Sequence, residues 1–177
     1  MKKLLLSITL LALSGCVTAD YVPRFGVSNP SGQAKLITAA QYIDYDERTH
    51  RSELKEFTGV DPVRTEWGAA FANAVLRESG VAGSESVSEH PLLARSFLTW
   101  GAGVDPADVR GGDIVGFPRG NASWQGHVGF YLGTTHVNGV EYYQILGGNQ
   151  SNRVSIELYP ASKALSIRRP ADPVVNQ

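Results

Sequence analysis

The hydrophobic pattern of this chain changes once, at Gly111-Gly112, from a helical period to a period of two. Before this point apolar residues recur every three or four positions, as on one face of an α-helix. After it they alternate with polar residues, as in β-strands. Helices that precede strands, rather than alternating with them, indicate an α+β domain. We therefore expect N-terminal helices packed on a C-terminal antiparallel sheet of about five strands.

Three segments of the first half show helical signals of ordinary strength. Residues 34–42 carry apolar side chains at near-helical spacing, and residues 52–57 end before Gly59, a residue typical of helix C-termini. Residues 88–100 also have apolar side chains at helical spacing, namely Leu93, Phe97 and Trp100. Each of these segments is predicted to form a helix.

The strongest helical signal lies in residues 65–77. Trp67, Phe71 and Val75 repeat every four positions and form one apolar stripe, with Gly80 just beyond the end. Thr65 is a favourable N-cap residue, so the helix is predicted to begin there.

Five short runs with a period of two follow Gly111-Gly112, and turns rich in Gly and Asn separate them. In the run that begins at His127, Val128, Phe130 and Leu132 share one face, so the His127 side chain is expected on the opposite face. The predicted strands are residues 113–117, 127–132, 141–146, 153–158 and 165–169.

The N-terminus has the pattern of a secretion signal. Met1-Lys2-Lys3 is positively charged, and the apolar run 4–13 is too short to span a bilayer. Leu13-Ser14-Gly15-Cys16 then resembles the lipobox of bacterial lipoproteins, in which the cysteine is acylated and begins the mature chain. We expect lipidation at Cys16. Val17, rather than aspartate, resembles an outer-membrane sorting signal, which predicts secretion across the inner membrane and anchoring to the outer membrane, facing the periplasm.

Cys16 is the only cysteine in the sequence, so an acylated chain has no free thiol and no internal disulfide. The expected organisation is a signal peptide over 1–15, a lipid-anchored linker over 16–33, one domain over 34–171 and a tail over 172–177. The formal net charge is −1 and the basic residues are scattered, which argues against nucleic acid as a partner. Partners are expected in the envelope, with the membrane contacted through the lipid anchor.

Five motifs occur in a fixed order: Glu66-Trp67-Gly68-Ala69-Ala70-Phe71, Ala94-Arg95-Ser96-Phe97-Leu98-Thr99-Trp100-Gly101, Gly112-Asp113-Ile114-Val115, Gly126-His127-Val128-Gly129-Phe130-Tyr131 and Leu146-Gly147-Gly148-Asn149-Gln150. This succession resembles the papain-like cell-wall hydrolases of the NlpC and CHAP type, over roughly residues 34–170. More narrowly, it is similar to a small bacterial and phage subfamily with Trp-Cys-Ala-Ala-Phe, Gly-His-Val-Gly-Phe and Leu-Gly-Gly-Asn-Gln motifs. The resemblance implies a papain-like fold.

The resemblance also implies a site that cuts peptide or amide bonds in peptidoglycan. Such a site has a cysteine thiolate at a helix N-terminus, a histidine base on a strand and a polar residue that orients the histidine. The base position falls on His127 and the orienting position on Asn149, with Gln150 as the weaker candidate. The nucleophile position falls on Gly68, which has no side chain to attack with. No cofactor is implied.

Two other sources of a nucleophile are weaker. Ser123 is near His127 in the sequence, but it lies in a turn with no helix terminus behind it. The four histidines of the sequence show no paired metal-ligand spacing. Because loss of a triad nucleophile costs on the order of a millionfold in rate, hydrolysis by this chain alone is not expected.

The sequence therefore favours a pseudoenzyme, a hydrolase-like lipoprotein that binds a peptidoglycan stem peptide or an envelope protein. Glycine inside a first helical turn costs about 1 kcal/mol relative to alanine, which a vacated active-site position explains better than a structural need. The alternative is an active peptidoglycan endopeptidase or amidase, through a Cys-to-Gly change at position 68 of this copy or through another nucleophile. A purely structural envelope lipoprotein is a third reading.

Overall fold

The computed structural model describes residues 30–171 of the 177-residue chain. The predictions for the signal peptide 1–15, for Cys16 and for the tail 172–177 therefore concern residues outside the described ones. The predicted linker 16–33 is described only from residue 30 onward. Within residues 30–171, no helix combines the length and the apolar character needed to cross a membrane.

Two of the predicted helices are present with shifted ends. The first, α1 (Pro30–Ala40), begins before residue 34, inside the predicted linker, because proline suits the first position of a helix, where its missing N–H would have no partner. The second, α2 (Arg51–Thr58), ends at Gly59, whose φ of 77° is the left-handed conformation of a helix C-terminus.

The best-predicted helix, α3 (Gly68–Glu78), begins three residues later than the sequence suggests, and the predicted N-cap at Thr65 is wrong. Trp67 occupies the N-cap position without a side-chain cap, and its ring is fully buried against Phe71. The Trp67 indole N–H donates to the buried Glu47 carboxylate at 3.3 Å. Tertiary packing of this tryptophan, rather than local capping chemistry, therefore sets the start of the helix.

The helix predicted over residues 88–100 is wrong. This segment forms turns and one short 3₁₀ helix, η2 (Ala94–Leu98). The Asn73 side chain, which projects from α3, donates to the Pro91 carbonyl at 2.9 Å. This hydrogen bond from a distant part of the chain occupies a carbonyl oxygen that a helix over this segment would use. Other single 3₁₀ turns are η1 (Ser84–Ser86), η3 (Pro106–Asp108) and η4 (Ala161–Lys163).

The five predicted strands form one antiparallel sheet, with a short additional strand at its edge. The spatial order is β1-β6-β2-β3-β4-β5. The longest pair, β3 and β4, is joined by Asn138-Gly139, both at positive φ, which is the turn that such hairpins favour. The strands are β1 (Ala102–Gly103), β2 (Ile114–Pro118), β3 (Gly126–Val137), β4 (Val140–Gln150), β5 (Arg153–Pro160) and β6 (Ser166–Arg169). The fold class is α+β.

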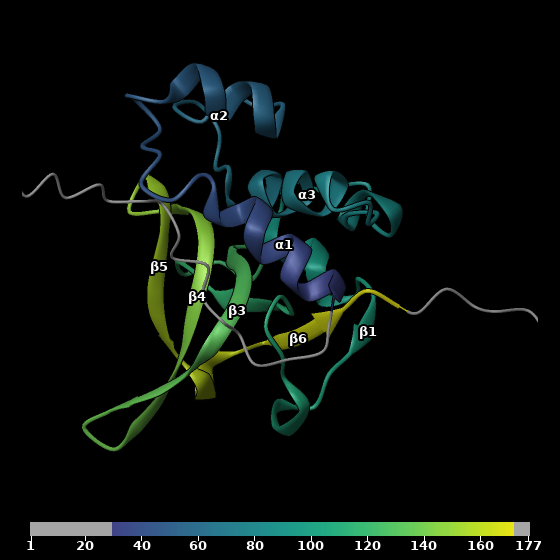
Figure 1. Ribbon diagram of the computed structural model, residues 1–177, viewed down its shortest axis with the longest axis vertical. Helices are drawn as coiled ribbons and strands as arrows, with labels where there is room; N and C mark the ends of the chain where they lie inside the picture. Colours follow the sequence, from purple (N-terminus) through teal and green to yellow (C-terminus); the bar gives the residue numbers. More distant parts are fainter. Residues whose placement is uncertain (1–29, 172–177) are drawn as a thin grey trace, which may run out of the picture.

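The sheet is strongly curved, and α1 and α3 cover one of its faces, with α2 further out (Figure 1). Val128 and Phe130 pack into the core under the helices, as the alternation predicts. Curvature also encloses the opposite face, where the Phe117 ring of β2 stacks on the Tyr159 ring of β5 at 4.6 Å, although β3 and β4 separate these strands. His127, on this second face, is therefore buried.

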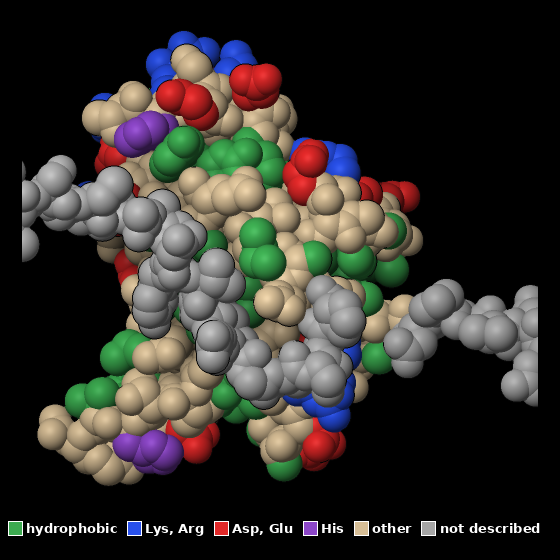
Figure 2. Space-filling view, viewed as in Figure 1, with side chains coloured by type: hydrophobic (Ala, Val, Ile, Leu, Met, Phe, Trp, Pro, Cys, Tyr) green, Lys and Arg blue, Asp and Glu red, His purple; other side chains and the backbone are tan. Residues whose placement is uncertain are grey.

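The surface around α2 is charged. On the face seen in Figure 2, Lys and Arg side chains lie among Asp and Glu side chains over this helix. Arg51 and Asp61 form an ion pair there, and Arg64 lies 3.7 Å from the same carboxylate. Positive and negative charges are thus mixed on this part of the surface.

Candidate functional site

The start of α3, the start of β3 and the end of β4 meet at one place. Gly68 is the first residue of α3, and His127 is the second residue of β3. A β-carbon added to Gly68 would lie 3.7 Å from Nδ1 and 3.8 Å from Cε1 of the His127 ring. The structure therefore brings the predicted nucleophile position and the predicted base side by side.

Gln150, the weaker sequence candidate, holds the His127 ring. Its Oε1 lies 2.9 Å from Nε2 of His127. Its Nε2 donates to the carbonyl oxygens of Ile145 at 3.2 Å and of Ser155 at 2.6 Å, which fixes the amide orientation. Because Oε1 only accepts, His127 must carry its proton on Nε2, and Nδ1 presents a lone pair toward position 68.

The expected contact between Asn149 and His127 is not formed. The Asn149 side chain instead donates to Oε2 of Glu66 at 2.7 Å. Asn149 has a φ of 57°, and the register of β4 with β5 shifts between Gly147 and Gln150. This irregularity turns Asn149 away and brings Gln150 to the imidazole. In the sequence, the Gly147-Gly148-Asn149 run was the signal that could have indicated this irregularity.

His127 is neutral over most of the pH range. Its side chain is 2% exposed, and its ring stacks on the Tyr159 ring at 5.2 Å. Burial lowers the pKa of His127 to about 4, the nearby Arg119 guanidinium lowers it further, and the Gln150 hydrogen bond acts in the opposite direction. A neutral imidazole with a free Nδ1 lone pair is the form that a general base requires.

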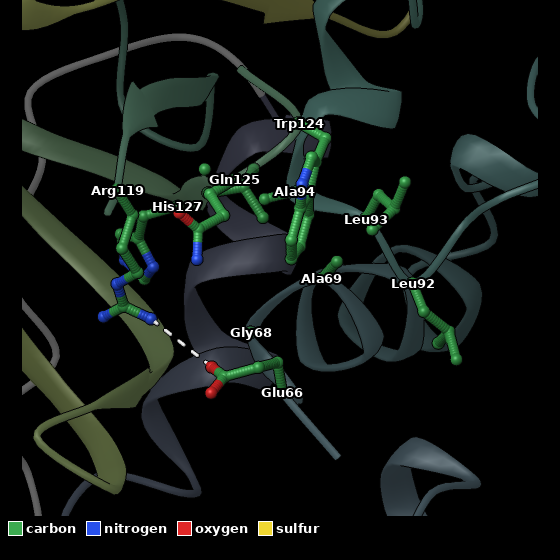
Figure 3. Close-up of a pocket in the computed structure, with 12 residues that line it drawn as sticks. Glu66, Gly68, Ala69, Leu92, Leu93, Ala94, Arg119, Trp124, Gln125 and His127 are labelled. Carbon is green, nitrogen blue, oxygen red and sulfur yellow. Dashed lines mark ion pairs between the residues drawn. The ribbon is translucent and has the colours of Figure 1, made fainter. Parts of the chain in front are cut away.

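A cavity of about 150 Å³ opens over His127 and the first turn of α3. One wall is apolar, formed by Trp124, Leu92 and Leu93 (Figure 3). On the other side, Arg119 and Glu66 lie 3.9 Å apart as a loose ion pair. No signal in the sequence pointed to Arg119. For Trp124, the available signal was that an aromatic residue stands within the turn that ends at Gly126.

The first turn of α3 contributes hydrogen-bond donors to this cavity. Gly68 and Ala69 line it, and the N-cap residue supplies no side-chain oxygen to their N–H groups. The first turn contains no acidic residue, so the positive end of the helix dipole is not offset within the helix. A carbonyl or other oxygen in the cavity would therefore find donors at this helix end.

Ser123, the other nucleophile considered from the sequence, is exposed in the loop between β2 and β3. It is not among the residues that line the cavity. No hydrogen bond joins it to His127 within the described chain. The geometry gives it no contact with the base.

Comparison of the whole sequence with protein-family models and with curated proteins found no match. Across residues 30–171, no three His, Cys, Asp or Glu side chains gather in a way that could hold a metal ion. The function of the site must therefore be argued from its own geometry.

Proposed function

We propose that this protein is an envelope lipoprotein with a papain-like domain that binds a cell-wall peptide or an envelope partner without cutting it. One observation carries the proposal. The free Nδ1 of His127 faces the place where a side chain at position 68 would begin, and position 68 is glycine. The site thus has a base, a residue that orients it and a helix N-terminus, but no nucleophile.

The chemistry of the rest of the chain supports the same proposal. A papain-like hydrolase needs a thiolate, and the single cysteine of the sequence, Cys16, lies in the proposed lipid anchor. Loss of a triad nucleophile costs on the order of a millionfold in rate. The cavity, by contrast, keeps polar and apolar walls that suit recognition of a ligand.

A second candidate function is an active peptidoglycan endopeptidase or amidase, of which this copy carries a Cys-to-Gly change. The protonation state of His127 favours it, because a buried histidine with a free Nδ1 lone pair would activate a thiol placed at position 68. This alternative differs from the first only in whether glycine is the natural residue there.

The test compares the unmodified protein, Gly68→Cys and the double variant Gly68→Cys/His127→Ala for release of soluble fragments from purified peptidoglycan. Binding of the unmodified protein to the same material is measured by co-sedimentation. We expect binding without release by the unmodified protein, and release by Gly68→Cys that the double variant lacks.

Release by the unmodified protein would contradict the pseudoenzyme proposal and point to another nucleophile. Absence of both binding and release in all three proteins would leave a structural role as the remaining explanation.

A further inference from the structure

The outer edge of β5 is only partly covered. β5 is the last strand in the order of the sheet, so β4 is its only neighbouring strand. At its beginning the N–H of Val154 donates to the Tyr45 carbonyl at 3.0 Å, and the N–H of Asp44 donates to the Val154 carbonyl at 2.9 Å. The segment 44–47 then continues toward Asn152, to whose carbonyl the N–H of Glu47 donates. The edge beyond Val154 is therefore left open.

The backbone groups on the open part of this edge follow from the strand alternation. Because the N–H and C=O of Val154 point away from β4, those of Ile156 and Leu158 point away from β4 as well. Within residues 30–171, no hydrogen bond joins these outward groups to another part of the chain. Two donors and two acceptors are therefore ready to pair with one more strand.

The side chains at these two positions are apolar and exposed. Ile156 and Leu158 lie on the same face as Val154, which is fully buried in the core under the helices. Both are 46% exposed, because the helices do not reach this part of the sheet. In Figure 1, β5 forms the left-hand edge of the sheet, and its later residues lie below the helices. An exposed apolar edge of this kind suits the addition of an extended segment.

A second copy of the chain fits this edge poorly. Two β5 strands paired about Ile156 would meet the segment that already covers the start of the edge. Paired about Glu157, they would place two carboxylates directly opposite each other, which is unfavourable. Paired about Leu158, they would bring Pro160 opposite Ile156, and proline has no N–H to donate. Each register has a defect, so the edge favours a strand of different sequence.

Glu157 indicates what that sequence contains. It lies between the two open positions, on the other face of β5, and is partly exposed. Its Oε1 accepts from the hydroxyls of Ser151 at 3.1 Å and Ser155 at 3.4 Å, and no cation of the described chain forms an ion pair with it. Directly opposite residues on paired strands have β-carbons about 5 Å apart and share one face. A lysine or arginine opposite Glu157 would therefore pair with its carboxylate.

We propose that the edge of β5 binds a partner protein through an extended segment of the pattern apolar–basic–apolar, added as an antiparallel strand. The basic residue lies opposite Glu157, and the apolar residues on either side exchange backbone hydrogen bonds with Ile156 and Leu158. The bridge between Asp46 and Arg153 is also antiparallel, so the added strand runs in line with the segment 44–47. No residue of β5 lines the cavity over the histidine, so this inference is independent of the proposed function.

The experiment uses the ¹⁵N-labelled full chain in detergent and the peptide acetyl-Thr-Val-Lys-Val-Thr-amide. Hydrogen exchange of the Ile156 and Leu158 N–H groups should be fast in the free protein and at least about tenfold slower with bound peptide, because one hydrogen bond then protects each. N-methylation of either valine, which removes an N–H that faces β5, should weaken binding at least about tenfold. N-methylation of the lysine, whose N–H points away from β5, is the matched control and should leave binding within about twofold.

Charge reversal tests the contact with Glu157. Replacement of the peptide lysine by glutamate should weaken binding about fivefold. Glu157→Lys should reverse this preference, so that the glutamate peptide binds about fivefold more tightly than the lysine peptide. Circular dichroism checks that the variant, changed at a partly exposed position, keeps its fold.

The inference is overturned if the lysine peptide does not bind, if lysine and glutamate peptides bind alike, or if N-methylation has the same effect at all three positions. Slow exchange of the Ile156 and Leu158 N–H groups before peptide is added would also overturn it. Sedimentation then identifies the occupant, because a dimer would assign the edge to a second copy and a monomer to another segment of the same chain.

Discussion

Two glycines face each other at the site, and they have different reasons to be glycine. A β-carbon on Gly148, near the end of β4, would lie 2.6 Å from Cβ of Phe71 and 2.7 Å from the Trp67 ring, closer than β-carbons approach other atoms. A β-carbon on Gly68, at the start of α3, would meet the Gly148 carbonyl oxygen at 3.1 Å, a close contact for which the β4 backbone would have to move by a few tenths of an ångström. Packing excludes a β-carbon at position 148, whereas at position 68 it only crowds one.

Backbone conformation does not require glycine at either position. Neither glycine has a positive φ, so neither needs the left-handed freedom that glycine alone provides. Backbone conformation therefore gives no reason for glycine at position 68, and the approach to the Gly148 carbonyl is the packing contact that favours it there. A glycine is informative about function when neither packing nor backbone geometry accounts for it.

The strongest test of this comparison is Gly148→Ala. We expect a loss of about 3 kcal/mol in the free energy of unfolding, because the methyl group would overlap the Trp67 and Phe71 rings in the core. Urea denaturation followed by circular dichroism measures it. Gly139→Ala, at a turn glycine with open space around it but a φ of 78°, serves as a surface control with a smaller loss. Equal stability of Gly148→Ala and the unmodified protein would break the contrast between the two glycines.

His127, whose Nδ1 faces position 68, should make the free energy of unfolding depend on pH. The pKa of His127 is lowered to about 4 in the fold, whereas an unfolded histidine has a pKa of about 6.5. Its contribution is therefore complete above pH 6.5 and is lost as pH falls toward 4, because only the unfolded chain takes up the proton in that interval.

Between pH 7.5 and pH 5 this linkage amounts to about 2 kcal/mol. Urea unfolding at both values, for the unmodified protein and for His127→Gln, isolates the share of this one residue. If the two proteins lose stability equally over this range, His127 is not the buried neutral group described above.

Substitutions at Asn149 should have a smaller effect on the free energy of unfolding, and they separate the role of Asn149 from that of Gln150. Asn149→Ala should cost about 1 kcal/mol, because alanine tolerates a φ of 57° poorly and the bond to Glu66 is lost. Asn149→Gly, which accepts this backbone conformation, should cost less. Neither change should move the titration of His127 followed by NMR, and a shift in either variant would return the orienting role to Asn149.

The smallest expected effect is that of Gly68→Ala. The gain in helix propensity, which at the first residue of a helix is smaller than the roughly 1 kcal/mol of a helix interior, is offset by the close approach of the Gly148 carbonyl, so the net change should stay within about 0.5 kcal/mol. Chemical denaturation beside the unmodified protein measures it. A loss greater than 2 kcal/mol would show that position 68 needs glycine for structural reasons, and would remove the main support for a vacated position.

The parts of the fold that were predictable are those in which local pattern and burial agree. Alternation over the β3 segment placed Val128 and Phe130 in the core and His127 opposite them, as observed. The period of Trp67 and Phe71 located α3 correctly, but not its first residue. That depends on the fit of Trp67 against Glu47, which is distant in the sequence.

The errors have a common physical cause. Residues 88–100 have a helical period, yet bonds from Asn73 to the Pro91 carbonyl and from Ser96 to Ser84 hold the segment in another shape. In the site, strand alternation could not rank Gln150 above Asn149, because a register shift in β4 changes which of the two side chains faces His127. Such long-range and irregular features leave little trace in local sequence.

The curvature of the sheet provides the site with an optical reporter. The Tyr159 ring stacks on the rings of both Phe117 and His127, and burial raises the pKa of its phenol to about 12, assisted by Glu157 and opposed by Arg119. At about pH 11, tyrosines with ordinary pKa values are mostly ionised and absorb as phenolates. Tyr159 stays protonated there as long as β2 and β5 remain curled around it. Burial also raises the pKa of Tyr42 and of Tyr143. Extra phenolate absorbance that a Tyr159→Phe variant lacks would therefore signal that the sheet has opened beneath the histidine.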